Sequence, residues 1–306
     1  MGSAGRAVAI GAFDGVHLGH REIIRGAVDA AARRHLTSMV ITFDPNPLAV
    51  LRPELKPAVL TSSALRARIV GTLGVEELLE IPFTTEFSRI RWERFCEILV
   101  SPPINAQSIS VGRNFRFGFG GEGTAKMLAD AGRARGIEVQ IPGLVTSCDQ
   151  KPISSTRVRR LIAQGDIDDA NALLGRAHCV EGLVVHGDGR GTGVGIPTAN
   201  IAVSNRAAVP GRGVYAGRLS ADGQSWAAAI NIGLAPTFRH STEIRIEAFL
   251  LDYAGGDLYD RHVGVAFLSR LRGEQRFPSP AALVVQIERD VAETRERVAG
   301  AHDPLC

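Results

Sequence analysis

Two histidines, His17 and His20, lie three residues apart in the stretch VAIGAFDGVHLGH at residues 8–20. The apolar run before them predicts a strand and the periodic pattern after them predicts a helix, so both imidazoles fall near a helix N-terminus. Backbone N–H groups and the helix dipole favour an anion there, and glycines let the backbone approach it closely. Imidazole donors could bind a phosphate oxygen and stabilise the charge that builds when the phosphorus is attacked. A tight turn with two surface histidines would fit the same spacing.

The elements that would position these histidines alternate between helix and strand. Helical patterns and short β-rich runs follow one another at 21–35, 39–43, 108–111, 124–136 and 138–142. A helix opening on a serine N-cap then ends at Gly165, and a shorter one capped by Asp166 ends at Gly175. This alternation predicts an α/β domain with a parallel sheet over residues 1–175.

The pattern changes after residue 175. Strand-like runs separated by turns follow one another with no long helix between them, as in CVEGLVVHG, GVYAGRLSAD and EIRIEAFLLD. They predict an all-β barrel or sandwich over residues 176–306. The end of this domain reads as a helix with Ser279 at the N-cap and Pro280 at the first helical position.

Composition limits the class of protein. The 306 residues carry 35 Lys and Arg against 32 Asp and Glu, and a net charge of +3 gives no reason to expect a nucleic acid or an acidic membrane as partner. Four cysteines lie far apart with no CxxC spacing, which argues against a zinc site and against a disulfide framework. The sequence has no signal-length apolar core and no run of about 18 apolar residues. We expect a reduced, cytoplasmic protein, and the oligomeric state stays open.

Motifs in both halves carry a resemblance. The first half holds GAFDGVHLGH (11–20), TFDPNP (42–47), VGRNFRFG (111–118) and ISSTRVR (153–159). The second holds VVHGDGRG (184–191), PTAN (197–200), GVYA (213–216), NIGLAPTF (231–238), DLY (257–259) and RLRGEQRF (270–277). Over nearly its whole length the chain resembles the bacterial bifunctional riboflavin kinase/FMN adenylyltransferases, or FAD synthetases. The resemblance implies a Rossmann-like nucleotidylyltransferase domain followed by a six-stranded β-barrel kinase domain with a C-terminal helix.

The resemblance implies that the first domain transfers AMP from ATP to FMN and releases pyrophosphate. His17 and His20 would be catalytic and would contact the ATP phosphates, and the ISSTRVR helix start would grip the leaving β- and γ-phosphates. The nucleotide- and phosphate-binding residues so implied are Gly11, Phe13, Asp14, Gly15, Gly19, Asn46, Asn114, Ser154, Ser155, Thr156 and Arg159. Asn46 departs from the family, which usually has a histidine there, and its amide can hydrogen-bond but cannot carry charge. Taken alone, ISSTRVR would also fit an ordinary helix N-cap.

The second domain is implied to phosphorylate riboflavin to FMN with ATP and Mg²⁺. Glu247 would be the catalytic base that accepts the proton of the ribityl 5′-hydroxyl. Thr198 and Asn200 would hold the metal, because magnesium selects hard oxygen ligands. The remaining implied residues are Gly187, Gly195 and Pro197 for the nucleotide, and Arg272, Glu274 and Phe277 for the flavin.

The strand pattern around Glu247 gives this role partial independent support. In EIRIEAFLL at 243–251, Arg245, Glu247 and Phe249 share one face, and Phe249 and Leu251 make that face unlike a solvated one. Without the resemblance, a surface glutamate on an edge strand would fit as well.

Departures from the family cluster in the kinase half. They are Thr192, Gly193, Ile196, Phe249 and Asp260, where the family usually has Arg, Thr, Phe, His and Gly. Because loss of a cation beside nucleotide phosphates weakens their binding, one alternative is that the barrel is a weak, degenerate or regulatory flavin-binding module. A class I aminoacyl-tRNA synthetase shares a His-rich signature, but a KMSKS-like element and a strongly basic composition are missing. A non-enzymatic flavin carrier would not need the phosphate-binding residues.

Overall fold

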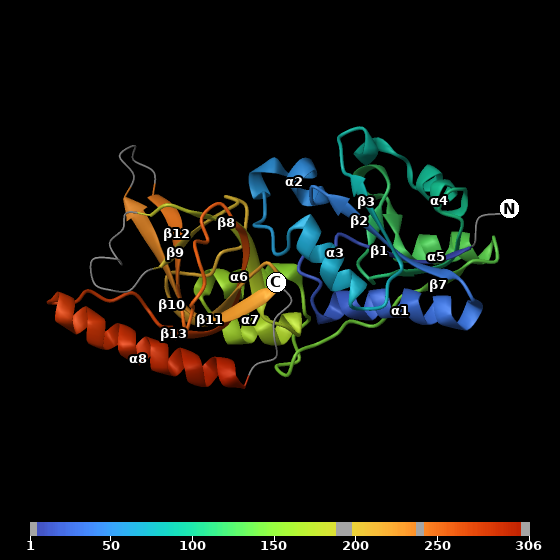
Figure 1. Ribbon diagram of the computed structural model, residues 1–306. Coiled ribbons are helices and arrows are strands. Elements are labelled where there is room, and N and C mark those ends of the chain that lie inside the picture. The colour runs from blue at the N-terminus through green and yellow to red at the C-terminus, as the bar shows by residue number, and fades with distance from the viewer. Residues whose placement is uncertain (1–4, 188–197, 237–241, 301–306) are drawn as a thin grey trace. The chain divides into compact units, whose positions relative to one another are not determined.

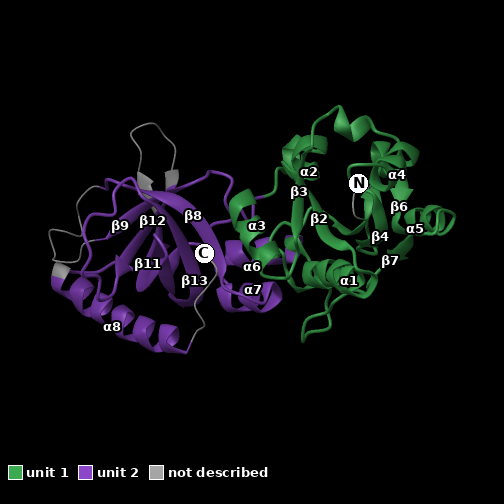
Figure 2. Ribbon diagram, turned by 45° about the vertical axis from the view of Figure 1, so that its right-hand side comes forward, with its two compact units in different colours: residues 1–57, 63–155 green, residues 58–62, 156–306 purple. Residues whose placement is uncertain are grey.

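The computed structural model describes residues 5–187, 198–236 and 242–300. The chain divides into two compact units, Met1–Pro57 with Ser63–Ser155 and Ala58–Ser62 with Thr156–Cys306 (Figure 2). Residues 156–175, expected in the first domain, are thereby grouped with the barrel, and the boundary after residue 175 stays a prediction. Five residues singled out from the sequence lie outside the described part: Thr192, Gly193, Gly195, Ile196 and Pro197.

The first unit contains the expected parallel sheet. Its five strands lie in the order β3-β2-β1-β4-β7, and every pair is parallel. The strands are β1 (Arg6–Ile10), β2 (Thr37–Asp44), β3 (Glu77–Pro82), β4 (Ala106–Val111) and β7 (Glu138–Gln140). The central strands are buried over nearly their whole length, as expected for a parallel sheet that is covered on both faces.

Helices cover both faces of this sheet (Figure 1). Helix α1 (Leu18–Arg34) packs Ala30 and Ala31 against Ala7 of β1. On the opposite face, α4 (Trp92–Val100) and α5 (Ala125–Arg133) enclose the larger core around Val8, Ile41 and Ile109. The unit is therefore Rossmann-like. Its smaller elements are α2 (Pro47–Leu51), α3 (Ser63–Gly71), β5 (Arg116–Phe117), β6 (Gly123–Thr124) and the 3₁₀ turns Pro53–Leu55, Phe87–Arg89 and Phe119–Gly121.

The strand order identifies where a ligand is expected. The chain runs outward from β1 to β2 and β3, then returns to place β4 on the other side of β1. In open α/β sheets, ligands bind beyond the carboxyl ends of the strands at such a reversal. The segments that leave β1 and β4 there are the glycine-histidine loop and the turn that contains Asn114.

The second unit contains a closed six-stranded barrel in the order β10-β11-β12-β9-β8-β13, with antiparallel pairing. The alternating runs that follow residue 175 therefore form a barrel and not a sandwich. The strands are β8 (His178–Val185), β9 (Ala199–Val203), β10 (Gly213–Ala221), β11 (Gln224–Pro236), β12 (Thr242–Leu250) and β13 (His262–Arg272). Helices α6 (Ser155–Gln164) and α7 (Ile167–Leu174) precede them.

The C-terminal helix α8 (Pro280–Ala299) confirms the predicted cap, because Ser279 Oγ accepts the N–H of Ala282 at 3.2 Å. The helix packs on β10, β11 and β13. Asp166 lies at the N-cap of α7 as expected, but its side chain makes no capping hydrogen bond there.

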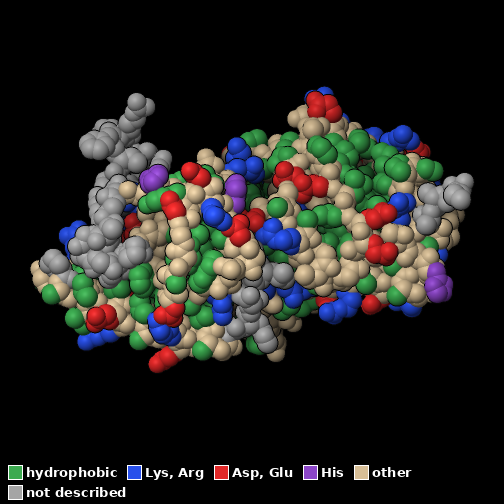
Figure 3. All heavy atoms as spheres, in the orientation of Figure 1, with side chains coloured by type: hydrophobic (Ala, Val, Ile, Leu, Met, Phe, Trp, Pro, Cys, Tyr) green, Lys and Arg blue, Asp and Glu red, His purple; other side chains and the backbone are tan. Residues whose placement is uncertain are grey.

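The cysteines depart from expectation in one respect. Cys96 and Cys148 are free thiols, whereas Cys179 is disulfide-bonded. The spacing argument against disulfides is therefore wrong for Cys179, because separation along the sequence does not limit which side chains meet in the fold. No helix within the described ranges is long and apolar enough to cross a membrane. Acidic and basic side chains are interspersed on the face shown in Figure 3.

His178 at the start of β8 makes the stability of the barrel sensitive to acid. Its ring is fully buried, and Nε2 lies 2.7 Å from the carbonyl oxygen of Ala208. Burial lowers the pKa of His178 to about 4. The hydrogen bond to Ala208 raises this pKa, and the positive charge of Arg176 lowers it further. Between pH 6.5 and 4 the unfolded chain therefore binds a proton that the folded barrel excludes, so stability falls as the pH falls.

We expect the free energy of unfolding of the barrel to decrease on acidification below pH 6.5, with a slope from His178 that approaches about 1.4 kcal/mol per pH unit. His178→Gln, which keeps a donor for Ala208, should flatten this slope between pH 6.5 and 5. Urea unfolding of the full chain in a Trp92→Phe background, in which Trp226 of β11 reports on the barrel, measures the difference. Equal slopes with and without the His178→Gln substitution would contradict the assignment.

Candidate active sites in the two units

The loop between β1 and α1 brings the predicted histidines together. His17 is the N-cap residue of α1, and its Nδ1 accepts the N–H of His20 at 3.2 Å. Because Nδ1 is an acceptor, a neutral His17 carries its proton on Nε2 and can donate from that atom. The His20 ring stacks on His17 with centroids 3.6 Å apart and an interplanar angle of 20°. Both imidazoles therefore lie at the N-terminal end of the helix, where an anion is favoured.

The backbone and a buried aromatic ring hold this pair in place. The edge of Phe13 contacts His20 at a centroid distance of 5.3 Å, and Phe13 is itself 1% exposed. Phe13 and Val16 have φ of 45° and 40°, a region that non-glycine residues rarely adopt and that clusters at functional sites. A Cβ at Gly19 would lie 3.2 Å from Cε1 of His17, so glycine leaves room for the ring.

The serine-rich stretch contacts the same loop. Ser155 Oγ donates to the carbonyl oxygen of Asp14 at 2.9 Å, and the Asp14 side chain is buried. Ser154 directly precedes it, whereas Thr156 and Arg159 are grouped with the second unit. Arg159 Nε donates to the carbonyl oxygen of Ala58 at 2.6 Å. The placement of Thr156 and Arg159 toward the histidines thus remains a prediction.

Two predicted asparagines differ in their surroundings. Asn46 caps α2, with its Oδ1 accepting the N–H of Leu48 at 3.1 Å, so its amide nitrogen is left to donate to a ligand. Asn114 is exposed in the turn that follows β4, at the strand reversal described above. Its position agrees with a contact to substrate beyond the carboxyl end of β1.

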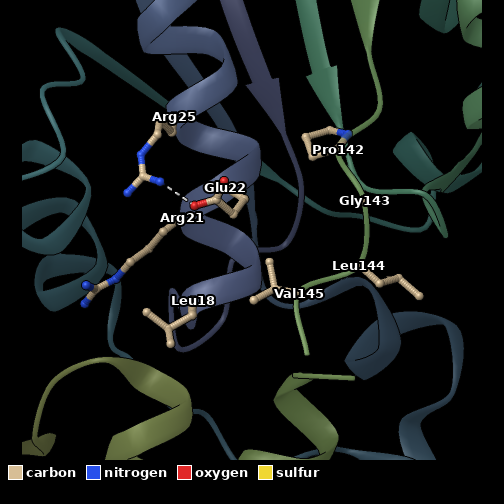
Figure 4. Close-up of a pocket in the computed structure, with 8 residues that line it drawn as sticks. All are labelled: Leu18, Arg21, Glu22, Arg25, Pro142, Gly143, Leu144 and Val145. Atoms are coloured by element: carbon tan, nitrogen blue, oxygen red, sulfur yellow. Dashed lines mark hydrogen bonds and ion pairs between the residues drawn. The ribbon is translucent and has the colours of Figure 1, made fainter. Parts of the chain in front are cut away.

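A pocket of about 400 Å³ lies between the first turns of α1 and the segment after β7 (Figure 4). It is lined by Leu18, Arg21, Glu22, Arg25, Pro142, Gly143, Leu144 and Val145. Leu18 directly follows His17 along the chain, but the residues that line the pocket include neither His17 nor His20. Its lining combines apolar side chains with two arginines, a chemistry that suits a ligand with both a ring and an anionic group.

Arg21 in this pocket was not predicted from the sequence. Its Nε is buried and has no hydrogen-bond partner within the described ranges, while Arg25 Nη1 is paired with Glu22 at 2.5 Å. Burial, and next the positive charge of Arg25, lower the pKa of Arg21. A signal existed in the sequence, because a cation in the first turn of a helix opposes the helix dipole and calls for an anionic partner.

In the barrel, three polar side chains form a row across neighbouring strands. Glu247 of β12 pairs in register with Asn200 of β9 on one side and Asn231 of β11 on the other. Directly opposite residues of an antiparallel sheet point to the same face. Their neighbours Ile201, Ile230 and Ile246 are buried, so the row lies on the outer face of the barrel. Glu247 is thus on a central strand, which excludes the edge-strand alternative.

The Glu247 carboxylate has two polar neighbours. Nδ2 of Asn231 donates to Oε2 at 3.4 Å, and Nη1 of Arg245 lies 3.6 Å from Oε1. The carboxylate is about 30% exposed, so a substrate hydroxyl can reach it. The predicted alternation is confirmed within β12, where Ile246, Ala248 and Leu250 are buried, whereas Leu251 lies beyond the end of the strand and is buried as well.

Gly187 and Asn200 approach each other closely beside this row. A Cβ at Gly187 would lie 2.1 Å from Nδ2 of Asn200, so a larger residue fits only if the Asn200 side chain moves. The Oδ1 atom of Asn200 is buried and has no hydrogen-bond partner within the described part of the chain. A buried acceptor without a partner costs free energy, and a cation or a donor would satisfy it. Thr198 lies two residues before Asn200, just ahead of β9.

We expect Gly187→Ala to impair the reaction of the barrel selectively. The added methyl group would displace the Asn200 side chain, and by loss of one oriented polar contact we expect a decrease on the order of 10-fold or more in FMN formation. The reaction of the first unit should be unchanged. The matched control is Gly256→Ala, because a Cβ at Gly256 would meet no atom within 4 Å. Gly223 also has open space around it, but its φ of 77° would strain an alanine. Equal FMN formation by Gly187→Ala and Gly256→Ala would contradict the close-approach argument.

The three predicted flavin residues lie at the end of β13 and beyond it. Arg272 is bound to Asp290 of α8, with Nη2 and Oδ2 2.7 Å apart, and its Cζ lies 5.6 Å from the centroid of the Phe277 ring. Glu274 Oε2 lies 3.5 Å from Nη1 of Arg212. Its Oε1 lies over Gly233 of β11, 3.1 Å from where a Cβ would be.

Comparison with known families covers both units. A family model described as FAD synthetase matches residues 2–157, and one described as riboflavin kinase matches residues 174–298. The chain belongs to the bifunctional riboflavin kinase/FMN adenylyltransferases. It is therefore an enzyme of FAD synthesis with a kinase half and an adenylyltransferase half, and nothing in the comparisons favours a barrel without activity.

Relatives of this bifunctional family match over nearly the full length. The bifunctional riboflavin kinase/FMN adenylyltransferase of Pseudomonas fluorescens is 37% identical over 295 residues, covering 96% of this chain and 94% of the relative. That of Escherichia coli K12 is 36% identical over 294 residues, covering 95% and 92%. The crystal structure named "Macrolide-efflux Protein from Streptococcus pneumoniae" has a TM-score of 0.85 and 33% identity, covering 96% of this chain and 95% of that one.

One departure from the riboflavin kinase pattern has a structural reading. Asp260, where the family usually has glycine, has φ of 60°. This left-handed conformation favours glycine, and aspartate is among the residues that tolerate it best. The backbone at Asp260 therefore adopts a conformation that a glycine would also favour.

Proposed function

We propose that the first unit transfers AMP from ATP to FMN at the histidine pair. The observation that carries this proposal is the stacking of His17 and His20 at the N-terminus of α1. An oxygen of the FMN phosphate attacks the α-phosphorus, and the bond to the bridging oxygen breaks as pyrophosphate leaves. Nε2 of His17, the ring of His20 and the helix N-terminus stabilise the charge on the α-phosphate during this exchange.

The other residues predicted for AMP transfer bind and orient the substrates. Ser154, Ser155, Thr156 and Arg159 hold the departing phosphates through hydroxyls, N–H groups and a cation, and Asn114 and the amide of Asn46 hold substrate near the α-phosphate. The loop residues Gly11, Phe13, Asp14, Gly15 and Gly19 shape the nucleotide site.

We propose that the barrel phosphorylates riboflavin with Glu247 as general base. The carboxylate accepts the proton of the ribityl 5′-hydroxyl while the oxygen of that group bonds to the γ-phosphorus of ATP and ADP leaves. Asn231 and Arg245 hold the carboxylate in place. Gly187, Gly195 and Pro197 border the nucleotide, and Arg272, Glu274 and Phe277 border the flavin ring.

Mg²⁺ fits the oxygen donors of this half. The buried, unpartnered Oδ1 of Asn200 and the hydroxyl of Thr198 are hard ligands of the kind that Mg²⁺ prefers. Such an ion usually keeps several waters and uses substrate phosphates as further ligands, so two protein oxygens suffice. When bound, Mg²⁺ neutralises charge on the ATP phosphates.

Chromatography of reaction mixtures tests these proposals. The full chain with riboflavin, ATP and Mg²⁺ should form FMN and FAD, and with FMN it should form FAD. Addition of EDTA should abolish FMN formation, and excess Mg²⁺ should restore it. Conversion of FMN to FAD without any conversion of riboflavin to FMN would show that the barrel is only a flavin-binding or regulatory module.

We also propose that the enzyme works in the cytoplasm on small-molecule substrates, with no nucleic acid as partner. The boundary between its adenylyltransferase and kinase domains is proposed to lie near residue 175. Separation of cytosolic and membrane fractions tests the location. Limited proteolysis with mass analysis of the fragments tests the boundary.

A further inference from the structure

Asp290 on α8 is a buried carboxylate that neither proposed reaction uses. Its side chain is about 6% exposed and accepts hydrogen bonds from Arg272 at Nε (3.0 and 3.1 Å) and Nη2 (2.7 Å). Gln286, one turn earlier on α8, donates to Oδ1 at 2.9 Å. Asp290 therefore meets the guanidinium with both oxygens, a bidentate geometry that fixes the plane of the cation.

This contact sets where the guanidinium lies relative to Phe277. The remaining nitrogen, Nη1, donates to the carbonyl oxygen of Gly273 at 3.2 Å, so every nitrogen of Arg272 is held. The cation lies 5.6 Å from the centroid of the half-buried Phe277 ring, within the range of a cation–π contact. The ring is thus kept at one place beside the end of β13 by a cation that α8 immobilises.

A buried ion pair of this kind is weak evidence for stability. Removing two charges from water costs several kcal/mol, and apolar residues of similar volume stabilise a fold as well or better. What such a pair provides is a fixed orientation of the two side chains, here of the Arg272 guanidinium against the Asp290 carboxylate. A geometry is useful here because the segment from Gly273 to Phe277 carries the residues placed beside the flavin.

We infer that Asp290 is a positioning residue for riboflavin: through Arg272 it holds the Phe277 ring where the flavin is bound, so that helix α8 determines the affinity of the kinase for riboflavin. This inference rests on the proposed flavin site. The Asn200–Glu247–Asn231 row lies on β9, β12 and β11, whereas Asp290 acts at the end of β13. Loss of Asp290 therefore changes binding of riboflavin and leaves ATP and the transfer step alone.

Steady-state kinetics of the full chain test this role. Asp290→Asn should raise the KM for riboflavin on the order of 10-fold, because the amide keeps one acceptor oxygen and turns a donor nitrogen toward the guanidinium, so the bidentate contact is lost. The kcat and the KM for ATP should stay within about twofold, since a loss of ground-state positioning alone appears in the KM. Gln286→Leu, which removes a single donor to Asp290, should give a smaller rise of about threefold. Glu288→Gln on the exposed side of α8 is the matched control.

The exchange variant Arg272→Asp/Asp290→Arg separates positioning from stability. It restores opposite charges across the contact but moves the guanidinium to α8, away from Phe277. We expect the unfolding temperature of the exchange variant to lie closer to that of the parent than the unfolding temperature of Asp290→Asn does. Its KM for riboflavin should still be raised. Recovery of both quantities together would overturn the inference, and so would a parallel loss of affinity for riboflavin and ATP in Asp290→Asn.

Two further measurements keep the outcome decisive. If the exchange variant does not fold, Gln286→Leu carries the test, and an unchanged riboflavin KM in that variant would overturn the inference. Phe277→Ala tests the flavin site itself: an unchanged riboflavin KM there means that the proposed site has failed. A raised KM in Phe277→Ala with an unchanged KM in Asp290→Asn means that the site stands and the positioning role does not.

Discussion

His20→Ala is expected to lower the rate of AMP transfer to FMN by on the order of 100-fold or more, and to leave the phosphorylation of riboflavin within about twofold. Removal of one preorganised donor to a developing charge has an effect of this size in other enzymes. The ring also stacks on His17 at 3.6 Å and meets the edge of Phe13, so its loss also frees the His17 ring from one side. FAD formation from FMN and FMN formation from riboflavin, measured on the same preparation, check this result.

Two variants sharpen the experiment on His20. His20→Asn keeps a hydrogen-bond donor and should retain more activity than His20→Ala. His35→Asn changes an exposed histidine at the other end of α1, where φ is 54° and asparagine is tolerated, so it should behave like the parent. An equal loss of both activities in a folded His20→Ala protein would contradict the assignment of the two reactions to separate sites.

Glu247→Gln is expected to lower the kcat of riboflavin phosphorylation by roughly 100-fold to 10,000-fold, with little change in the KM for riboflavin. Glutamine matches glutamate in shape but cannot accept the proton, so the loss falls on turnover and not on binding. The partners Asn231 and Arg245 remain in place, which favours a conserved fold. Single-turnover FMN formation measures the step directly.

Controls for Glu247 come from the same unit. Glu288→Gln removes an exposed carboxylate from α8 and should not change FMN formation. AMP transfer by the first unit should be unaffected in both variants. A Glu247→Gln protein with parental kcat would show that another group accepts the proton and that the outer-face row serves binding alone.

Periodic and motif-based signals determined much of this protein from its sequence. The apolar runs at 39–43 and 108–111 and the helical pattern at 21–35 correspond to β2, β4 and α1, because local burial patterns follow the period of each element. The cap at Ser279 was equally readable, since an N-cap depends on a few adjacent residues. The motif order and the family it implies required no structure either.

Other features depend on contacts between residues far apart in the chain, which no local pattern encodes. Strand order decided that the turn of Asn114 follows the strand beside β1, and barrel closure decided that Glu247 lies between Asn200 and Asn231, 47 and 16 positions away. The buried state of His178, the disulfide at Cys179 and the pairing of Arg272 with Asp290 are likewise tertiary. The physical reason is common to all of them: a side chain's charge, partner and orientation are set by the surface packed against it, and that surface comes from another part of the chain.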